Sequence, residues 1–136
     1  MIKPINRNPL TLAQPAQPAT KSDLTTGQDL QDTLAANSDR CVGMAANMIG
    51  VNKAIIIAQL GPFPVVMYNP QITARSQPFK TTEGCLSLDG ERATTRDKQI
   101  TLRYQDSNFA WHTQQFVDFP AQIIQHECDH LQGTLI

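Results

Sequence analysis

The segment His126-Glu127-Cys128-Asp129-His130 constrains this chain more than any other feature, because it places two histidines four residues apart. In a helix, residues i and i+4 lie on the same face, so both imidazoles can reach one metal ion. Glu127 lies beside them, where a carboxylate can accept a proton from a water molecule. The pattern predicts a helix that supplies two metal ligands and a general base.

The residues around this segment are typical of a helix. Asp118 suits the N-cap, Pro120 the first turn, and Gly133 the position just after the last turn. The apolar face of this helix is predicted to consist of Phe119, Ile123, Ile124 and Leu131. The alternative is an ordinary solvated or core-packed helix that carries the two histidines by chance, and the helix signals favour the metal site.

A zinc-type site needs a third protein ligand. Only six residues follow His130, which leaves no later helix for a thermolysin-like carboxylate, and the metzincin histidine position holds Ile136. We therefore expect the third ligand upstream. Cys85, within the segment 83–87, is the candidate, since a thiolate binds zinc or iron strongly.

The remaining cysteines and the third histidine have simpler interpretations. Cys128 is two residues from each motif histidine, so a helix turns it away from them, and it is predicted to be core. Cys41 is either a reactive thiol or a loop packing residue, and packing is favoured. His112 has no partner at a ligand-like spacing and is expected at the surface or an interface. The low, odd cysteine count argues against a disulfide framework.

Length and charge exclude several classes of function. The 136 residues fit a single domain spanning 1–136. Net charge is −1 and the 11 basic residues are scattered, so no nucleic-acid partner is expected. No apolar run approaches the roughly 20 residues of a membrane span, and no signal pattern opens the chain. We expect a soluble cytoplasmic protein without a membrane partner.

The rest of the chain predicts a mixed fold. Residues 1–21 contain four of the nine prolines and are expected to be extended. A helix capped by Ser22 or Thr25 should run to about Ala36, with apolar residues Leu24, Leu30 and Leu34. Residues 41–51 are expected to form a small-residue loop.

Several segments have strand character. Residues 54–58 are a β-branched run, Gly61-Pro62 should turn the chain into a strand at 64–68, and Asn69-Pro70 should end it. Further extended segments are expected at 72–74, 81–88, 99–104 and 110–116. The predicted fold is α+β, with mostly antiparallel β-sheets packed around the central metal-binding helix and an additional N-terminal helix.

Three segments together resemble the peptide deformylase family. Its motifs G-x-G-x-A-A-x-Q, E-G-C-x-S and Q-H-E-x-D-H-L-x-G correspond in order to residues 41–48, 83–87 and 125–133, and the second and third match in full. The resemblance implies a metallohydrolase that removes formyl from N-terminal formyl-methionine of polypeptides. It implies Cys85, His126 and His130 as ligands of one divalent ion, most often Fe²⁺, with Zn²⁺ or Ni²⁺ as substitutes.

The resemblance also implies a mechanism. The ion lowers the pKa of a water molecule, and Glu127 takes its proton and passes it to the leaving amine. The developing oxyanion is held by the metal, the backbone N–H of Leu86 and the motif glutamine. That glutamine is replaced here by Met48, whose thioether cannot donate a hydrogen bond. Losing one such donor typically costs about 2.7–4 kcal/mol. The neighbouring Asn47 is a weaker candidate for a substitute donor.

Other implied roles concern substrate binding. Arg92 matches an arginine that contacts the peptide in the family, although a solvated strand charge is an equal alternative. Gly43 and Met48 belong to the first motif, and Ile123 could line a methionine pocket or the core. Gln125 and Asp129 are candidates to orient the ligands. Cys41 replaces the first motif glycine, which would strain the loop if that position needs a positive φ.

Three functions stay open from the sequence. The first is a working deformylase, at full or reduced rate, that acts on formyl-methionyl peptides. The second is an inactive metal-binding protein that retains such peptides, motivated by Met48, and intact Glu127 counts against it. The third is a hydrolase of another small N-acyl substrate. Contact with the ribosome is left open.

Overall fold

A computed structural model describes residues 1–134, so the last two residues of the predicted domain lie outside the described part. One antiparallel sheet has the strand order β1-β2-β3-β4-β5. The strands are β1 (Gly43–Ala45), β2 (Ile55–Leu60), β3 (Phe63–Cys85), β4 (Leu88–Gln105) and β5 (Trp111–Val117). The helices are α1 (Pro9–Leu12), η1 (Lys21–Asp23), α2 (Leu24–Ala36), η2 (Ala46–Ile49) and α3 (Asp118–Leu131). The predicted α+β class is confirmed.

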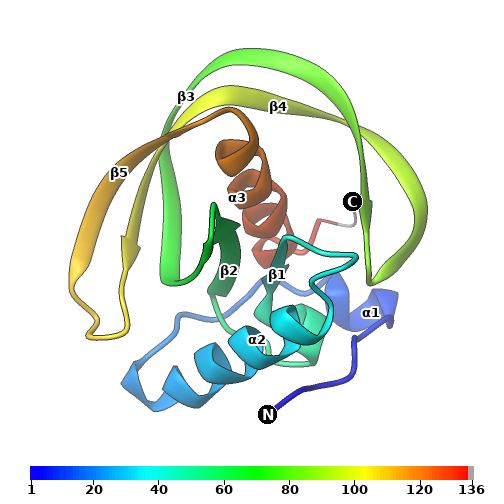
Figure 1. The fold of residues 1–136 in the computed structure, drawn as a ribbon, viewed down its shortest axis with the longest axis vertical. Helices are drawn as coiled ribbons and strands as arrows, with labels where there is room; N and C mark the ends of the chain where they lie inside the picture. Colours follow the sequence, from blue (N-terminus) through cyan, green and yellow to red (C-terminus); the bar gives the residue numbers. More distant parts are fainter. Residues whose placement is uncertain (135–136) are drawn as a thin grey trace.

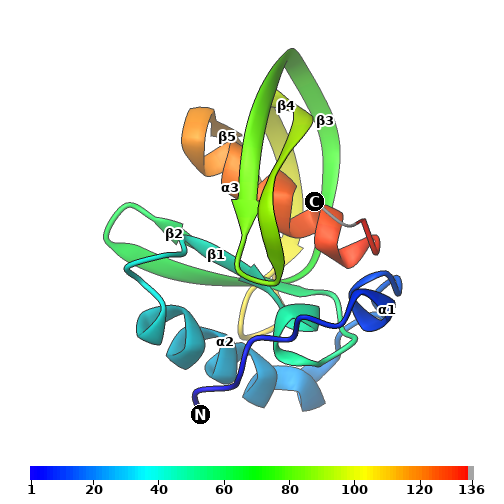
Figure 2. The ribbon, with the colours of Figure 1, turned by 90° about the vertical axis from the view of Figure 1, so that its right-hand side faces the viewer.

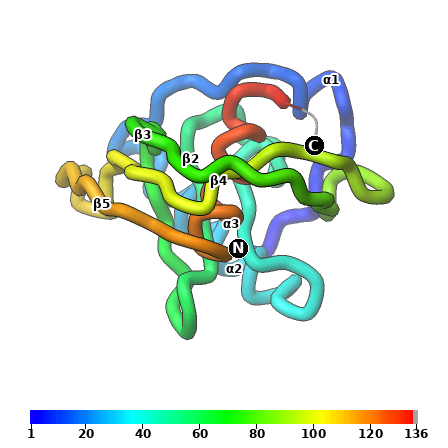
Figure 3. The backbone as a smooth tube through the Cα atoms, turned by 90° about the horizontal axis from the view of Figure 1, so that it is seen from above, coloured from blue at the N-terminus to red at the C-terminus, as the bar shows by residue number. Residues whose placement is uncertain are grey.

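The long strands β3 and β4 arch over α3, while α2 lies on the other side of β1 and β2 (Figures 1 and 2). Seen from above, β3 and β4 run side by side across the molecule (Figure 3). The expected placement of the metal-binding helix at the centre of the fold is therefore confirmed. No helix within the described residues is long and apolar enough to cross a membrane.

Strand β2 is buried on both faces. Ile56 and Ala58 pack with the apolar side chains of α3, and Ile55 and Ile57 pack with those of α2. Alternate residues of a strand point to opposite faces, so a continuous β-branched run fits a strand placed between two helices. This arrangement fixes α3 against one side of the sheet, where the motif histidines lie.

The proline-rich N-terminal segment is not wholly extended, contrary to the prediction. α1 begins at Pro9, where a missing N–H costs no helical hydrogen bond. The Asn8 side chain caps this helix by accepting from the Leu10 N–H at 3.0 Å. The η1 turn also falls at the end of the segment. The number of prolines in this segment argued against any helix, but Pro9 stands at the first position of α1, where a helix tolerates proline.

Helix α2 is present, but its predicted caps are wrong. The Asp23 carboxylate accepts from the Thr20 N–H at 2.8 Å, so the capping interaction lies one turn before α2, on η1. Leu30 and Leu34 are buried as expected, whereas Leu24 is 39% exposed. The predicted loop 41–51 contains β1 and η2, because the backbone of β1 pairs with β2.

The predicted end of a strand at Asn69-Pro70 is also wrong, since β3 continues to Cys85. The pairing of β3 with β4 shifts register between Tyr68 and Gln71, so Pro70 lies in a bulge where its missing N–H interrupts no regular pairing. Asn69 accommodates the bend with a φ of 51°. Asn69-Pro70 therefore forms a β-bulge inside β3 and does not end the strand.

Helix α3 begins and ends close to the predicted positions. Asp118 is its first residue, with a φ of 56°, and makes no capping hydrogen bond, so the predicted cap is wrong. Phe119 is 56% exposed and does not belong to the buried face, unlike Ile123, Ile124 and Leu131. Gly133 follows the helix with a φ of 79°, as expected for a C′ glycine.

Candidate metal centre

The three predicted ligands lie together where the end of β3 meets α3. The Nε2 atoms of His126 and His130 are 3.2 Å apart, and Cys85 Sγ lies 3.3 Å from His130 Nε2. All three donor atoms lie within 4.8 Å of one another. One thiolate and two imidazoles fit zinc or iron and leave a further coordination position open.

Cys85 reaches α3 because of the hairpin between β3 and β4. Cys85 pairs with Leu88, so only Leu86 and Ser87 form the connecting turn. The turn places the thiol at the end of a long strand that arches over α3 (Figure 1). His126 and His130 are both buried, on successive turns of the helix. The site therefore combines a local helical spacing with the contact between Cys85 and His130, which are 45 residues apart in the chain.

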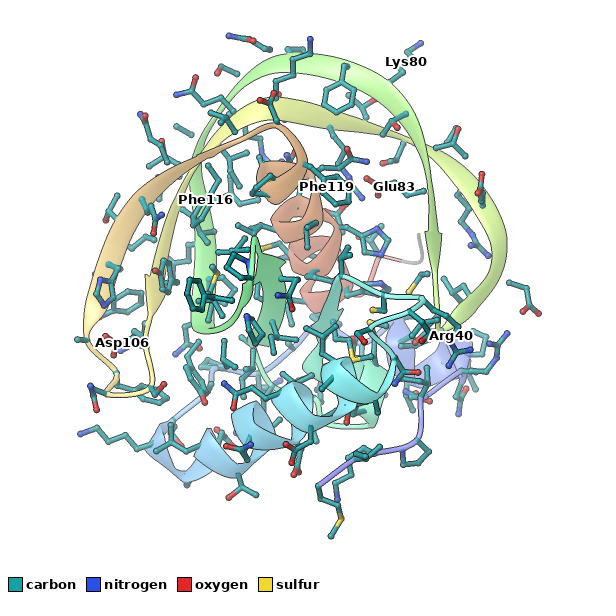
Figure 4. All side chains as sticks on the ribbon, in the orientation of Figure 1. Arg40, Lys80, Glu83, Asp106, Phe116 and Phe119 are labelled. Carbon is teal, nitrogen blue, oxygen red and sulfur yellow. The ribbon has the colours of Figure 1, made fainter. Side chains whose placement is uncertain are left out.

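Glu83 is the main site residue that the sequence interpretation did not assign. Its Oε1 lies 2.8 Å from His126 Nδ1, on the side of the ring opposite the metal-facing Nε2. Gln122 donates to Glu83 Oε2 at 2.8 Å. Glu83 lies beside α3 (Figure 4). Its signal was present in the sequence, because residues i and i+2 of a strand share a face and Glu83 precedes Cys85 by two.

The buried Arg96 connects Glu83 to α3. Its Nη2 donates to Glu83 Oε1 at 2.7 Å, and its Nη1 donates to Asp129. Burial raises the pKa of Glu83, but hydrogen bonds from His126, Arg96 and Gln122 outweigh it and lower that pKa to about 2. Glu83 therefore stays ionised and holds His126 through a charge-assisted hydrogen bond.

The two candidates for orienting the ligands differ. Asp129 acts through Arg96, as described above. Gln125 contacts no ligand: its Nε2 donates to the Asp97 carbonyl at 2.8 Å, and its Oε1 accepts from the Asp97 N–H at 2.9 Å. Gln125 therefore ties α3 to β4.

The two motif histidines have opposite electrostatic surroundings. Burial lowers the pKa of His126, but hydrogen bonds to Cys85 and Glu83 raise it more, to about 10. Burial and the neighbouring charges of His126 and Arg96 lower the pKa of His130 to about 3. His130 is therefore neutral and offers a free lone pair, and a metal ion binding at His126 would displace a proton.

Glu127 is buried beside the ligands, and its Oε1 has no hydrogen-bond partner among the described residues. Burial raises the pKa of Glu127 to about 7, so the carboxyl group can exchange a proton near neutral pH. Gly43 makes room for it, since a Cβ there would lie 2.9 Å from Glu127 Oε2. The arrangement suits a general acid/base that awaits a substrate or water partner.

A cavity of about 690 Å³ opens onto this site. Its lining includes the predicted residues Gly43, Met48, Leu86, Ile123, Cys85, His126 and Glu127. Arg92, the predicted peptide contact, does not line it and instead pairs with Glu83 in the β3–β4 register. The cavity wall also includes Gln122, which the sequence analysis did not predict. Gln122 lies in the first turns of α3, where the sequence pattern indicated only an apolar face.

The residues that depart from the first motif can be placed as well. Met48 is buried against the cavity, so the position of the motif glutamine holds a side chain without a hydrogen-bond donor. Asn47 donates its side-chain amide to the His130 carbonyl at 2.9 Å, so that group is already used. Cys41 is not among the described residues with a positive φ, so replacing the motif glycine by cysteine does not strain the backbone there.

The other cysteines and His112 agree with their simpler interpretations. Cys41 Sγ donates to the Gly43 carbonyl at 2.7 Å, and burial raises the pKa of its thiol to about 12, which favours packing over reactivity. Cys128 is buried in the core. His112 is exposed and contacts Asp106 at 2.6 Å.

In comparisons with known proteins, a family model and curated relatives of one kind match this chain. The family model described as polypeptide deformylase matches residues 2–136. A peptide deformylase from Clostridium beijerinckii is 49% identical over 136 residues, covering 100% of both chains. Another from Chlorobium luteolum is 33% identical and covers 99% of this chain and 76% of the relative.

Solved structures of peptide deformylases share the fold. The class I type b peptide deformylase from Acinetobacter baumannii, bound to Met-Ala-Ser, superposes with a TM-score of 0.90 at 27% identity, covering 99% of this chain and 97% of the other. The peptide deformylase from Thermotoga maritima gives 0.89 at 27% identity, with 99% and 95% covered.

Proposed function

This chain belongs to the peptide deformylase family, and we propose that its α3 site removes the formyl group from N-terminal formyl-methionine of polypeptides and releases formate. The observation that carries the proposal is the convergence of Cys85, His126 and His130 beside the buried carboxylate of Glu127, whose Oε1 has no hydrogen-bond partner within residues 1–134. A metal-dependent hydrolase needs both parts. We further propose that residues 1–136 act as one domain.

The resident ion belongs to the proposal. The family resemblance favours Fe²⁺, and the ligand set of one thiolate and two imidazoles suits Zn²⁺ and Ni²⁺ as well. When bound, such an ion polarises the formyl oxygen and lowers the pKa of a water molecule. The unpaired Glu127 carboxylate next to the three donor atoms supports a site of this kind, because an ion and a water molecule would provide its missing partner.

Glu127 moves the proton in the proposed reaction. Its pKa of about 7 lets it accept a proton from the attacking water and then deliver that proton to the leaving nitrogen. A carbon–oxygen bond forms, the formyl carbon–nitrogen bond breaks, and formate and a free amine result. Both transfers use one carboxylate whose burial keeps its pKa close to the working pH.

Two groups flank the position where negative charge develops on the formyl oxygen. The backbone N–H of Leu86, next to the ligand Cys85, is the proposed protein donor. Met48 lines the same cavity but offers no hydrogen. Because one oxyanion donor is worth roughly 10²–10³ in rate, we expect this site to turn over more slowly than one with an amide at position 48.

The substrate is proposed to lie along the cavity wall formed by Gly43, Met48 and Ile123. Met48 and Ile123 provide apolar surface for a methionine side chain, and the neighbour that binds Met-Ala-Ser supports a methionyl peptide as ligand. The predicted contact of Arg92 with the peptide stays a prediction: Arg92 is not among the residues that line the cavity, but it lies opposite Glu83, which is one of them. Formyl-methionine begins newly made polypeptides, so the activity is proposed to be cytoplasmic.

The direct test is formate release from formyl-Met-Ala-Ser by protein loaded anaerobically with Fe²⁺, or with Ni²⁺. Turnover that disappears in Glu127→Ala while metal content is retained would support the proposal. Tight peptide binding without turnover, in wild type and Met48→Gln alike, would indicate a binding protein instead. Turnover of N-acetyl but not N-formyl peptides would indicate a different acyl substrate.

A further inference from the structure

We propose that Arg7 is a positioning residue of the active site: together with Asn6 it bridges the two walls of the cavity and holds the turn after Cys85 in place. One wall is η2, which carries Met48. The other is the turn that begins at Leu86. The inference rests on the proposed function, because it assigns a catalytic role to the backbone that Arg7 holds.

Asn6 fastens the N-terminal segment to η2. Its backbone N–H donates to the Met48 carbonyl at 2.6 Å, and its Nδ2 donates to the Asn47 carbonyl at 3.0 Å. Its Oδ1 accepts from the Asn8 N–H at 3.0 Å, just before α1. A further bond runs from Asn6 Nδ2 to Thr11 Oγ1 at 2.9 Å, so Asn6 is fixed at four points and the direction in which Arg7 leaves the backbone is restricted.

Arg7 fastens the opposite wall. Its Nη1 donates to the Leu86 carbonyl at 2.9 Å, and its Nη2 contacts the Asp89 carboxylate. Leu86 lies in the two-residue turn between β3 and β4, Asp89 follows that turn in β4, and Arg7 itself lines the cavity. A planar guanidinium can satisfy a carbonyl and a carboxylate at once, whereas an ammonium on a flexible stem is less well preorganised to do so.

The position of this contact explains its proposed consequence. The Leu86 carbonyl belongs to the peptide plane between Leu86 and Ser87, which adjoins the plane that carries the Leu86 N–H, so restraining it limits the motion of the two-residue turn in which that N–H lies. The Asp89 side chain is 95% exposed and that of Arg7 is 53% exposed, so their ion pair by itself contributes little. The bond to the Leu86 carbonyl is therefore the part that positions the turn.

Arg40 provides a matched control. It also lines the cavity and its side chain is 62% exposed, but its contacts are to Asn37 and Asp39, which lie before β1. Arg40→Gln removes the same charge from the same cavity without touching the bridge. Comparing it with Arg7→Gln separates loss of positioning from loss of positive charge.

The test uses the full chain loaded with Ni²⁺ and measures amide hydrogen exchange by mass spectrometry in a peptide spanning residues 84–90. Arg7→Gln is expected to speed exchange in this segment about tenfold, because the turn opens more often. Arg7→Lys should give an intermediate rate, and Arg40→Gln the wild-type rate. The kcat for formyl-Met-Ala-Ser should fall about three- to tenfold in Arg7→Gln while KM changes little, because the Leu86 N–H acts on the transition state, and Tm should be little changed.

Exchange at 84–90 that is equal in wild type and Arg7→Gln would overturn the inference, as would an equal increase in Arg40→Gln. If Arg7→Gln does not fold, the exchange rate of Arg7→Lys is the test. A rate at 84–90 equal to that of the wild type in Arg7→Lys would then overturn the inference. A wild type that binds nickel but releases no formate would refute the proposed function, and the exchange measurement would still test whether Arg7 holds the turn.

Discussion

Glu83 Oε1 lies 2.8 Å from His126 Nδ1, so a carboxylate from β3 holds the ring of a proposed metal ligand on α3. The same carboxylate receives Arg96 and Gln122, which leaves it little freedom to turn. A ligand imidazole fixed through its second nitrogen presents the first nitrogen in one orientation and is a better donor. The strand thus contributes to the metal site twice, at Cys85 and at Glu83.

Glu83→Gln is expected to weaken metal affinity by about 10- to 100-fold, because a neutral amide replaces the charge that orients His126. Competition with a chelator, followed by metal analysis, measures the change. Glu91→Gln is the control, since Glu91 is exposed on the facing strand and contacts no ligand. Equal affinity in Glu83→Gln and Glu91→Gln would contradict the role given to Glu83.

Met48→Gln should raise kcat for a formyl-methionyl peptide by about 10² if the amide reaches the developing oxyanion. Met48→Leu, which keeps an apolar side chain of similar size, should leave kcat near the wild-type value. Steady-state formate release at saturating substrate provides the measurement. A Met48→Gln protein no faster than Met48→Leu would show that the wild-type site does not lack a donor at this position.

Gly43→Ala should both lower activity and destabilise the fold by about 1–3 kcal/mol. The added Cβ would lie 2.8 Å from Ile123 Cγ2 and 2.9 Å from Glu127 Oε2, so these two buried side chains must shift. Gly84→Ala is the matched control, because its nearest contact would be an ordinary 3.6 Å. Denaturant unfolding measures the free energy of unfolding of both variants. Equal values for Gly43→Ala and Gly84→Ala would refute the steric argument.

The metal-free protein should lose stability as pH falls from about 4.5 towards 2. Glu83 has its pKa lowered to about 2 in the folded protein, against 4.5 as its ordinary value. A carboxyl group with a lowered folded pKa stabilises the protein above its unfolded pKa, and that contribution is lost on acidification. Urea unfolding across this pH range, with chelator present, should show a shallower decline in Glu83→Gln. A decline as steep as that of the wild type would contradict this assignment.

Local patterns determined the metal-binding helix and the buried strand. The i, i+4 spacing of His126 and His130 needs only helical geometry, and the β-branched run of β2 needs only burial on both faces. Cys85 and Glu127 could be nominated from residue chemistry and the family motifs. These features depend on neighbours within a few positions, which is why the sequence alone could predict them.

Tertiary structure decided everything that depends on how distant segments pair. The bulge that carries β3 through Pro70 and the contact of Glu83 with His126 follow from strand register, which no local pattern specifies. The same register places Arg92 opposite Glu83. The sequence by itself determined which atoms could bind a metal, and the β3–β4 hairpin folded over α3 decided which side chains hold and surround them.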